Sequence, residues 1–490
     1  MKKRKIPVLL CTIIATFLLS SAIPFLLGES VSARHFEDVA VETTADITRN
    51  CTFDVSENKE SLAKLTDASV STDWTAANAA YIDIRTTQRI GSLYIEWTSL
   101  PAAWTLSVWK KDKFIPYKAG GTNGFINEFI TIEASCTRIR ILWEKGSAKV
   151  SIGRITVFSP GKAPDGIQQW KPSCTKADLL LISTHADDEH LYFGGTLSTY
   201  AGELKKNVQV AYLINCGILR TRELLAGLWV VGVTNYPVIS DFPDQYVANL
   251  NAASDFYGYR KVLEYQVMLL RRFKPDVAVG HDLNGEYGHG AHMLNAKTLT
   301  EAIEAAQDPL QFPDTAKQYG TWAIKKLYLH LYDKNTVIMD WTLPLSAFDG
   351  KSSWEMAQLG YAQHVSQHQF KFRVRIEGPN DCRKFGLFYT SVGADVLKND
   401  FFENIPASPA VIIHDPTSDS RMDPGGSSPG AEISDGASSA LSGTQEGNGR
   451  FHFGIGAGSV IFLVLILYLL FVRRNRRRKR RKRPVIRKIR

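Results

Sequence analysis

An uncharged apolar run near the C-terminal end limits most strongly how this chain can fold. Residues 453–472, FGIGAGSVIFLVLILYLLFV, form a stretch of 20 residues without an acidic or basic side chain. At about 1.5 Å per residue, a helix of that length matches the roughly 30 Å hydrocarbon core of a bilayer. Residues 473–490 hold 13 basic and no acidic side chains, and such flanks stay in the cytoplasm. The sequence therefore predicts a single-pass cell-membrane protein with a transmembrane helix at 453–472, a basic cytoplasmic tail at 473–490 and an extracytoplasmic body.

The N-terminal end has the pattern of a secretory signal. Basic residues at positions 2–5 precede a long apolar stretch, and the small-residue sequence Val31-Ser32-Ala33 follows it. We expect a signal peptide at 1–33. The length of the apolar stretch and the presence of Pro24 leave open the alternative that it stays uncleaved as an anchor. Both interpretations place the following residues outside the cytoplasm.

The net charge fits this topology better than it fits a nucleic-acid partner. The chain carries 58 Lys and Arg against 49 Asp and Glu, a formal charge of +9. Without the 13 basic residues of the tail and the four at the N-terminus, the remainder carries −8. A mildly acidic body does not attract polyanions, so we expect no nucleic-acid partner.

Residues 36–160 have the pattern of an antiparallel β-sandwich. Short runs in which residues alternate with a period of two, rich in Trp, Tyr, Ile and Val, occur at 80–85, 92–97, 105–110, 138–143 and 151–158. The sequences Leu65-Thr66-Asp67, Ser71-Thr72-Asp73-Trp74 and Tyr81-Ile82-Asp83-Ile84 resemble the opening of the discoidin (F5/8 type C, galactose-binding-like) family. This resemblance implies a sandwich with carbohydrate-binding loops at one end. Cys51 and Cys136 flank its strands and could form a disulfide in an oxidising compartment.

The pattern changes after residue 166 to buried strands that alternate with helices. Continuous apolar runs at 178–184, 207–215 and 275–281 are typical of buried parallel strands, and 263–273 and 292–307 are helix-like. We therefore expect a Rossmann-like α/β layered domain at 170–404 with a mainly parallel sheet, whose sites lie at the carboxyl ends of the strands. Residues 405–450, rich in Ser, Gly, Pro, Asp and Ala, predict a flexible stalk.

Two clusters of ionisable residues stand at the ends of predicted strands. The first is HADDEH at 185–190, and the second is GHDLNGEYGHGAH at 280–292. Adjacent carboxylates beside an imidazole resist joint ionisation unless a positive charge lies among them. The sequence therefore predicts a divalent metal at this edge of the sheet.

Spacing within the clusters indicates how the ion is held. His185 and Asp188 can converge on one ion while Asp187 points past it toward a bound water, and His289 and His292 enter from the neighbouring strand end. A His, Asp, His triad with a water is the open coordination of catalytic zinc.

These motifs together resemble the PIG-L and LmbE family of zinc-dependent de-N-acetylases. The likeness covers roughly residues 177–367. It includes HADDE at 185–189, an Arg-x-x-Glu-Leu step at 220–224, the Arg-Phe-x-Pro-Asp sequence at 272–276, the block HDLNGEYGHGAH at 281–292 and His-Val-Ser-Gln at 364–367. The resemblance implies a hydrolase acting on linear amides.

Metal ligands follow from the resemblance position by position. It implies His185, Asp188 and His292 as ligands of one Zn²⁺ per chain, and Fe²⁺ or another divalent metal also suits such a donor set. The family usually has Asp at the position of Ala291. That carboxylate would hold the acid histidine and raise its pKa, so we expect its loss to slow the reaction or shift its pH optimum.

The same resemblance implies roles for five further residues. Asp187 is the implied general base, His289 the acid or electrostatic partner, and Tyr287 a donor to the carbonyl oxygen. Arg220 and Asp244 match positions that contact the sugar in relatives.

The sequence as a whole predicts an extracytoplasmic, membrane-tethered, metal-dependent deacetylase. It would hydrolyse the N-acetyl group of N-acetylglucosamine-type sugars to acetate and amine, with an N-acetylated sugar or glycan as partner. Two alternatives remain open at this point: a non-catalytic carbohydrate-binding surface protein, and an amidase acting on another N-acyl substrate. Nothing in the sequence determines the oligomeric state.

Overall fold

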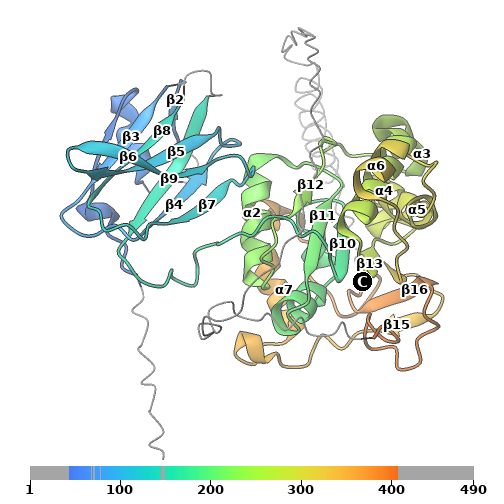
Figure 1. The fold of residues 1–490 in the computed structure, drawn as a ribbon. Coiled ribbons are helices and arrows are strands. Elements are labelled where there is room, and N and C mark those ends of the chain that lie inside the picture. The colour runs from blue at the N-terminus through green and yellow to red at the C-terminus, as the bar shows by residue number, and fades with distance from the viewer. Residues whose placement is uncertain (1–43, 68, 70–71, 78, 145–148, 407–490) are drawn as a thin grey trace, which may run out of the picture. The chain divides into compact units, whose positions relative to one another are not determined.

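The computed structural model describes residues 44–406, except 68, 70–71, 78 and 145–148 (Figure 1). The predicted signal, the stalk beyond residue 406, the transmembrane helix and the basic tail lie outside the described residues. Among the residues that are described, none of the helices is both long and apolar enough to cross a bilayer. The described chain is multidomain, with an antiparallel N-terminal region (residues 44–158) followed by an α/β region (residues 170–404).

The N-terminal region consists of two antiparallel sheets, in the orders β1-β3-β8-β5-β6 and β2-β9-β4-β7. Each of the five strands predicted from alternation is present. The elements are η1 (Thr48–Asn50), β1 (Thr52–Val55), η2 (Lys59–Leu65), β2 (Trp74–Ala76), β3 (Tyr81–Arg85), β4 (Ser92–Trp97), β5 (Trp104–Lys110), β6 (Lys113–Gly120), β7 (Asn127–Thr131), β8 (Arg138–Trp143) and β9 (Val150–Phe158).

Tryptophans from both sheets form the centre of this core. Trp74, Trp97 and Trp143 are fully buried, and the ring centroids of Trp74 and Trp97 lie 6.5 and 6.1 Å from that of Trp143. These three side chains therefore pack the core and do not form a surface for a sugar. Cys51 and Cys136, which the sequence left as a possible disulfide pair, are both free thiols in the structure.

The α/β region is built on a seven-stranded sheet of order β12-β11-β10-β13-β14-β16-β15. Pairing is parallel from β12 to β14, and β16 and β15 add antiparallel strands, so the predicted mainly parallel sheet is confirmed. The strands are β10 (Leu179–Ser183), β11 (Val208–Tyr212), β12 (Val238–Ile239), β13 (Val277–Gly280), β14 (Lys326–His330), β15 (Thr336–Ile338) and β16 (Lys384–Thr390).

Helices cover both faces of this sheet (Figure 1). Leu179 and Leu181 of β10 pack in a cluster with side chains of α2 and α7, whereas Leu180 and Ile182 face side chains of α4 and α5. A strand covered on both sides must be apolar throughout, which explains the continuous run LLLIS. The helices are α1 (Asp188–Leu191), η3 (Ser198–Glu203), α2 (Gly217–Val230), α3 (Leu250–Ala253), η4 (Ser254–Gly258), α4 (Tyr259–Phe273), η5 (Glu286–Gly288), α5 (Gly290–Ala305), α6 (Pro313–Tyr319), η6 (Ser346–Phe348), α7 (Ser353–Tyr361) and η7 (Val365–Phe370).

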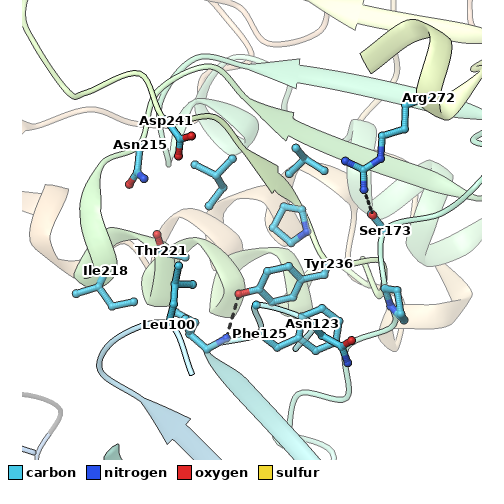
Figure 2. A pocket seen from close by; sticks show the side chains of 16 residues that line it. Leu100, Asn123, Phe125, Ser173, Asn215, Ile218, Thr221, Tyr236, Asp241 and Arg272 are labelled. Carbon is cyan, nitrogen blue, oxygen red and sulfur yellow. Dashed lines mark hydrogen bonds between the residues drawn. The ribbon is translucent and has the colours of Figure 1, made fainter. Parts of the chain in front are cut away.

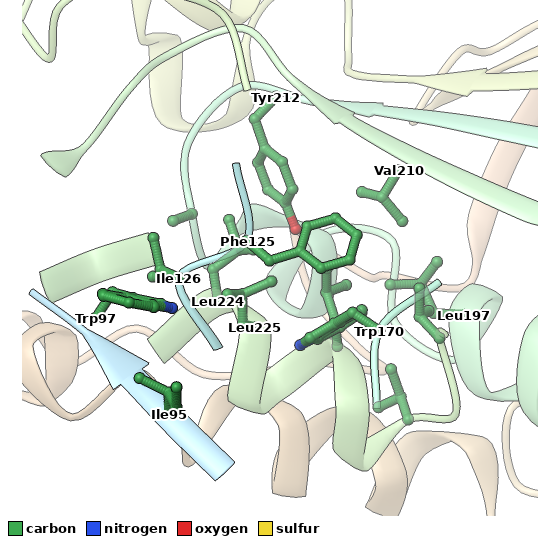
Figure 3. Close-up of a cluster of buried hydrophobic side chains, with 14 of the residues drawn as sticks. Ile95, Trp97, Phe125, Ile126, Trp170, Leu197, Val210, Tyr212, Leu224 and Leu225 are labelled. Atoms are coloured by element: carbon green, nitrogen blue, oxygen red, sulfur yellow. The ribbon is translucent and has the colours of Figure 1, made fainter. Parts of the chain in front are cut away.

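Direct contacts join the N-terminal region to the α/β region. The Ile126 N–H donates to the Tyr236 hydroxyl at 3.2 Å, and the Phe125 ring stacks on the Tyr236 ring at 4.4 Å between centroids (Figure 2). The Arg222 guanidinium, on α2, donates to the Trp97 carbonyl oxygen at 2.7 Å. Figure 3 shows the buried cluster to which Phe125 and side chains of α2 belong. The two regions therefore share one continuous core.

A buried ion pair in β14 gives a direct test of packing in the α/β region. The Lys326 ammonium is fully buried, where it contacts the Asp395 carboxylate, the Tyr328 hydroxyl and the Glu403 carbonyl oxygen. We expect Asp395→Ala to lower the free energy of unfolding by about 3–5 kcal/mol, because it leaves a buried ammonium without its counter-ion. Denaturant unfolding followed by circular dichroism measures this, with the exposed Asp333→Ala as control. A loss below about 1 kcal/mol would contradict the expectation.

Candidate metal centre

The two ionisable clusters meet because their strands are neighbours. Strands β10 and β13 pair in parallel, with Leu181 opposite Val279, so their carboxyl ends lie at the same edge of the sheet. HADDEH follows β10 directly, and the block 281–292 follows β13. The structure thus places both clusters where the sequence predicts a site.

Three buried side chains present donor atoms to a common point. His185 Nδ1 lies 3.3 Å from Asp188 Oδ2 and 3.0 Å from His292 Nε2, and His292 Nε2 lies 3.1 Å from Asp188 Oδ2. Donors about 2.0–2.1 Å from a tetrahedral zinc ion are separated by roughly 3.3 Å. The three residues therefore fit a divalent metal in both chemistry and spacing.

The Asp188 carboxylate is held ionised at this point. Burial acts to raise its pKa, but the His292 and His185 imidazoles more than offset burial, and the pKa lies well below its ordinary value. An anionic Asp188 is the form that binds a divalent cation, and such a cation would displace the proton that Asp188 and Glu286 favour on His292.

The candidate ligand His292 contacts a carboxylate that the sequence did not single out. Glu286 is fully buried, and its Oε2 lies 3.0 Å from His292 Nδ1 and 2.7 Å from His281 Nδ1. Its Oε1 lies 3.0 Å from His330 Nδ1 at the end of β14. Burial opposes ionisation, yet the neighbouring imidazoles, His281 first, lower the pKa of Glu286 well below its usual range. A metal-bound histidine with such a partner is fixed in tautomer and orientation.

Glu286 does not replace the carboxylate that position 291 lacks, because it contacts His292 and His281 and not the candidate acid His289. Ala291 is fully buried, and its backbone N–H donates to His289 Nδ1 at 3.2 Å. Position 291 therefore orients His289 through its main chain, while Glu286, five residues earlier, supports His292. Glu286 lies inside the sequence block 281–292, so the motif could have indicated its role. His330 belongs to no such motif and is marked only by its position at the end of an apolar run.

The candidate base Asp187 lies beside the metal ligands and is nearly buried. Burial raises the pKa of Asp187 well above its ordinary value, and the negative charge of Asp188 raises it further. Arg220, on α2, acts in the opposite direction, with its Nη2 3.3 Å from Asp187 Oδ1. Its Nη1 lies 3.5 Å from Asp244 Oδ2. The carboxylate of Asp244 is 44% exposed, so it can also reach solvent or a ligand.

His289 and Tyr287 lie at the mouth of the cluster. Because His289 Nδ1 accepts a backbone N–H, the proton of the neutral ring is on Nε2. Burial, followed by the charges of His292 and His185, lowers the pKa of His289 to about 3. The ring centroid of Tyr287 lies 5.8 Å and that of Tyr246 5.1 Å from the His289 ring. Two tyrosine rings therefore flank the neutral imidazole of His289.

The structure brings all eight predicted site residues to this one edge of the sheet. They are His185, Asp187, Asp188, Arg220, Asp244, Tyr287, His289 and His292. Sequence reasoning missed the roles of Glu286, His281, His330, Glu189 and His364, which become visible only through their contacts.

A separate cavity of about 460 Å³ lies where loops of the N-terminal region meet α2 and β12 (Figure 2). Phe125, Tyr236, Asn215, Asp241 and Arg272 are among its lining residues. None of the eight predicted site residues lines it, so this cavity is distinct from the metal donors.

Comparison with known proteins agrees with the site. Residues 180–303 match the family model described as PIG-L, GlcNAc-PI de-N-acetylase. These residues are a PIG-L family domain. This PIG-L domain contains all eight predicted site residues, and PIG-L deacetylases are metal-dependent hydrolases that act on amides.

Relatives and solved structures match parts of the chain. A 1D-myo-inositol 2-acetamido-2-deoxy-alpha-D-glucopyranoside deacetylase from Geodermatophilus obscurus is 27% identical over 182 residues, which is 31% of this chain and 60% of the relative. A second such deacetylase, from Rhodococcus jostii, is 29% identical over 178 residues, again 31% of this chain and 60% of the relative. The chain thus spans about 60% of the length of these curated relatives.

The N,N'-diacetylchitobiose deacetylase of Pyrococcus horikoshii shares 18% identity over 39% of this chain and 71% of that protein, with a TM-score of 0.32. An F5/8 type C domain from Bacteroides fragilis shares 10% identity over 24% of this chain and 96% of that domain, with a TM-score of 0.20.

Proposed function

We propose that the α/β region is a metal-dependent de-N-acetylase that hydrolyses the N-acetyl group of N-acetylglucosamine-type sugars to acetate and a free amine. The observation that carries this proposal is the buried donor set of His185, Asp188 and His292 beside the carboxylate of Asp187. A pure carbohydrate-binding protein has no need for a carboxylate of raised pKa next to a metal. The PIG-L domain supports the same reaction class.

A divalent metal held by His185, Asp188 and His292 would supply Lewis acidity toward the acetamide carbonyl and toward water. Asp187 then takes up the proton that the attacking water loses, and its raised pKa makes it a stronger base than an ordinary aspartate. The neighbouring Arg220 guanidinium holds that carboxylate in place.

Charge on the former carbonyl oxygen is stabilised by neutral donors at the mouth of the site. The Nε2–H of His289 and the hydroxyl of Tyr287 are the candidates, since both lie beside the metal ligands. The proton released by the water ends on the leaving nitrogen, so water and amide give acetate and amine. Asp244, together with Arg220, is placed to contact hydroxyl groups of the sugar.

We further propose that this activity lies outside the cytoplasm on a membrane-tethered chain. The uncharged run at 453–472 and its basic flank support this topology. The discoidin-like opening of the N-terminal region supports a role in bringing the site to a glycan. The stalk at 405–450 would give the site reach from the membrane.

The direct test is release of acetate and free amine by the purified full-length chain, loaded with zinc, in detergent. Substrates should include N-acetylglucosamine, its β-1,4-linked oligomers, a GlcNAc-inositol conjugate and N-acetylated amino acids. We expect equal amounts of acetate and amine from the GlcNAc-type compounds. Release from the amino acids alone would favour the amidase alternative, and no release from any compound would reject the enzyme.

A further inference from the structure

The main chain at Asp187 has an uncommon conformation. Its φ is +120° and its ψ is −27°. The other described non-glycine residues with positive φ lie between 47° and 65°, in the left-handed helical region. Asp187 lies outside that region. A residue with a side chain adopts the conformation of Asp187 only at a cost in free energy, so the surrounding structure must enforce it.

One buried carboxylate is bonded to this strained peptide. The Asp187 N–H donates to Glu189 Oε2 at 2.8 Å. The other oxygen, Oε1, lies 2.9 Å from His364 Nε2, and His364 comes 175 residues later, beyond the end of α7. Glu189 and His364 are both fully buried. Glu189 therefore connects the strained turn to a distant part of the fold.

Two glycines allow helices α2 and α7 to pack closely against the histidines beside the Glu189 carboxylate. A Cβ added to Gly360 of α7 would lie 2.3 Å from His190 Cε1. A Cβ on Gly227 of α2 would lie 2.7 Å from His190 Nε2 and 3.2 Å from His364 Nε2. Both helices therefore approach the His190 ring closely, and α2 also approaches His364, so a larger residue at either glycine would displace these side chains. His364 can thus hold Glu189 in one place.

We propose that Glu189 and His364 are positioning residues that hold the Asp187 peptide at positive φ and so aim the Asp187 carboxylate. The Asp187 N–H donates to Glu189, while the Asp187 carboxylate contacts Arg220. Without the acceptor at Glu189, Asp187 relaxes to negative φ and its carboxylate leaves this position. The catalytic part of the proposal rests on the proposed function, in which Asp187 is the base; the conformational part does not.

Kinetics of the zinc-loaded full-length chain test the catalytic part. We expect Glu189→Ala to lower kcat by about 100-fold, because a displaced base is poorly placed for proton transfer. KM should change less than about two-fold and one metal should remain bound. In Glu189→Gln the amide oxygen can still accept from the Asp187 N–H, so we expect recovery to within about 10-fold of the wild type. His368→Ala is the matched control, since His368 is exposed, belongs to η7 and does not contact Glu189.

Equal losses in Glu189→Ala and Glu189→Gln would overturn the positioning role. Loss of the metal in Glu189→Ala would overturn it as well, because Glu189 would then support the metal site as a whole. A wild-type chain that hydrolyses no substrate contradicts the proposed function, and the conformational part is then decided by unfolding alone.

Thermal unfolding of the same chain tests the conformational part without any substrate. Asp187→Gly and Asp187→Ala both remove the carboxylate, but glycine alone tolerates this φ. With Glu189 present, we expect the glycine variant to melt higher than the alanine variant, and this advantage should shrink by about 2–4 °C when both carry Glu189→Ala. An equal advantage in the two backgrounds would show that Glu189 does not enforce the conformation.

Discussion

Replacing Asp187 with asparagine is expected to lower the rate of acetate release by about 10²- to 10⁴-fold, the range that general-base catalysis contributes. The amide has nearly the shape of the carboxylate but cannot take up a proton at neutral pH. The donors His185, Asp188 and His292 are unchanged, so about one metal ion per chain should remain bound. Acetate release by the zinc-loaded chain and metal analysis of the same sample measure both quantities.

The control for this variant is Asp241→Asn, which makes the same chemical change at an exposed position that lines the separate cavity. Its activity should stay close to that of the wild type. An Asp187→Asn chain that keeps more than about a tenth of the wild-type rate would show that another group accepts the proton.

Removing one metal ligand is expected to have the second large effect. In His185→Ala, the bound metal should fall from near one per chain toward zero after dialysis, and acetate release should fall with it. His185 Nδ1 is one of only three donors in the proposed set, and it lies 3.0–3.3 Å from the other two. Two remaining donors hold a divalent ion weakly in competition with water.

Metal content measured by atomic emission decides the outcome, with His368→Ala as a histidine replacement away from the site. If His185→Ala retains a full equivalent of metal, the ligand assignment is wrong. His289 would then be the first replacement to consider, because its donor atom lies within 4.8 Å of those of His185 and His292.

The sequence predicts well those elements whose structure depends on the residues of one short segment. The runs 178–184, 207–215 and 275–281 became β10, β11 and β13, since a strand covered on both faces must be apolar. The antiparallel strands β15 and β16 were not predicted. Strand β16 is defined by pairing with β14, and β15 by pairing with β16, and both pairings are contacts between distant segments rather than local patterns.

The same distinction applies to the site. HADDEH and the block 281–292 are local motifs, and they contain six of the eight candidate residues; Arg220 and Asp244 came from the family resemblance. The contacts that hold these motifs in place come from distant parts of the chain. His330 contacts Glu286 across 44 residues of sequence, and His364 contacts Glu189 across 175 residues. No spacing within a motif reveals such a partner.

The possible disulfide between Cys51 and Cys136 could not be decided from sequence for a related reason. Cys51 and Cys136 flank the strands of the N-terminal region in the sequence, but a disulfide needs Cβ atoms about 3.5–4.5 Å apart. In the fold, the Cys51 thiol instead donates to the Ile47 carbonyl oxygen at 3.3 Å. Flanking positions in the chain therefore said nothing about proximity in space.

Helix α2 has a consequence for how such chains can be recombined. Its Arg220 contacts Asp187, the proposed base, and two residues later its Arg222 donates to the Trp97 carbonyl oxygen of the N-terminal region. Exchanging the N-terminal region for an unrelated carbohydrate-binding module would remove this contact of Arg222, two residues along the helix from Arg220. A chimaera that changes glycan preference therefore requires redesign of the outward face of α2, and the two regions are best inherited and engineered as one unit.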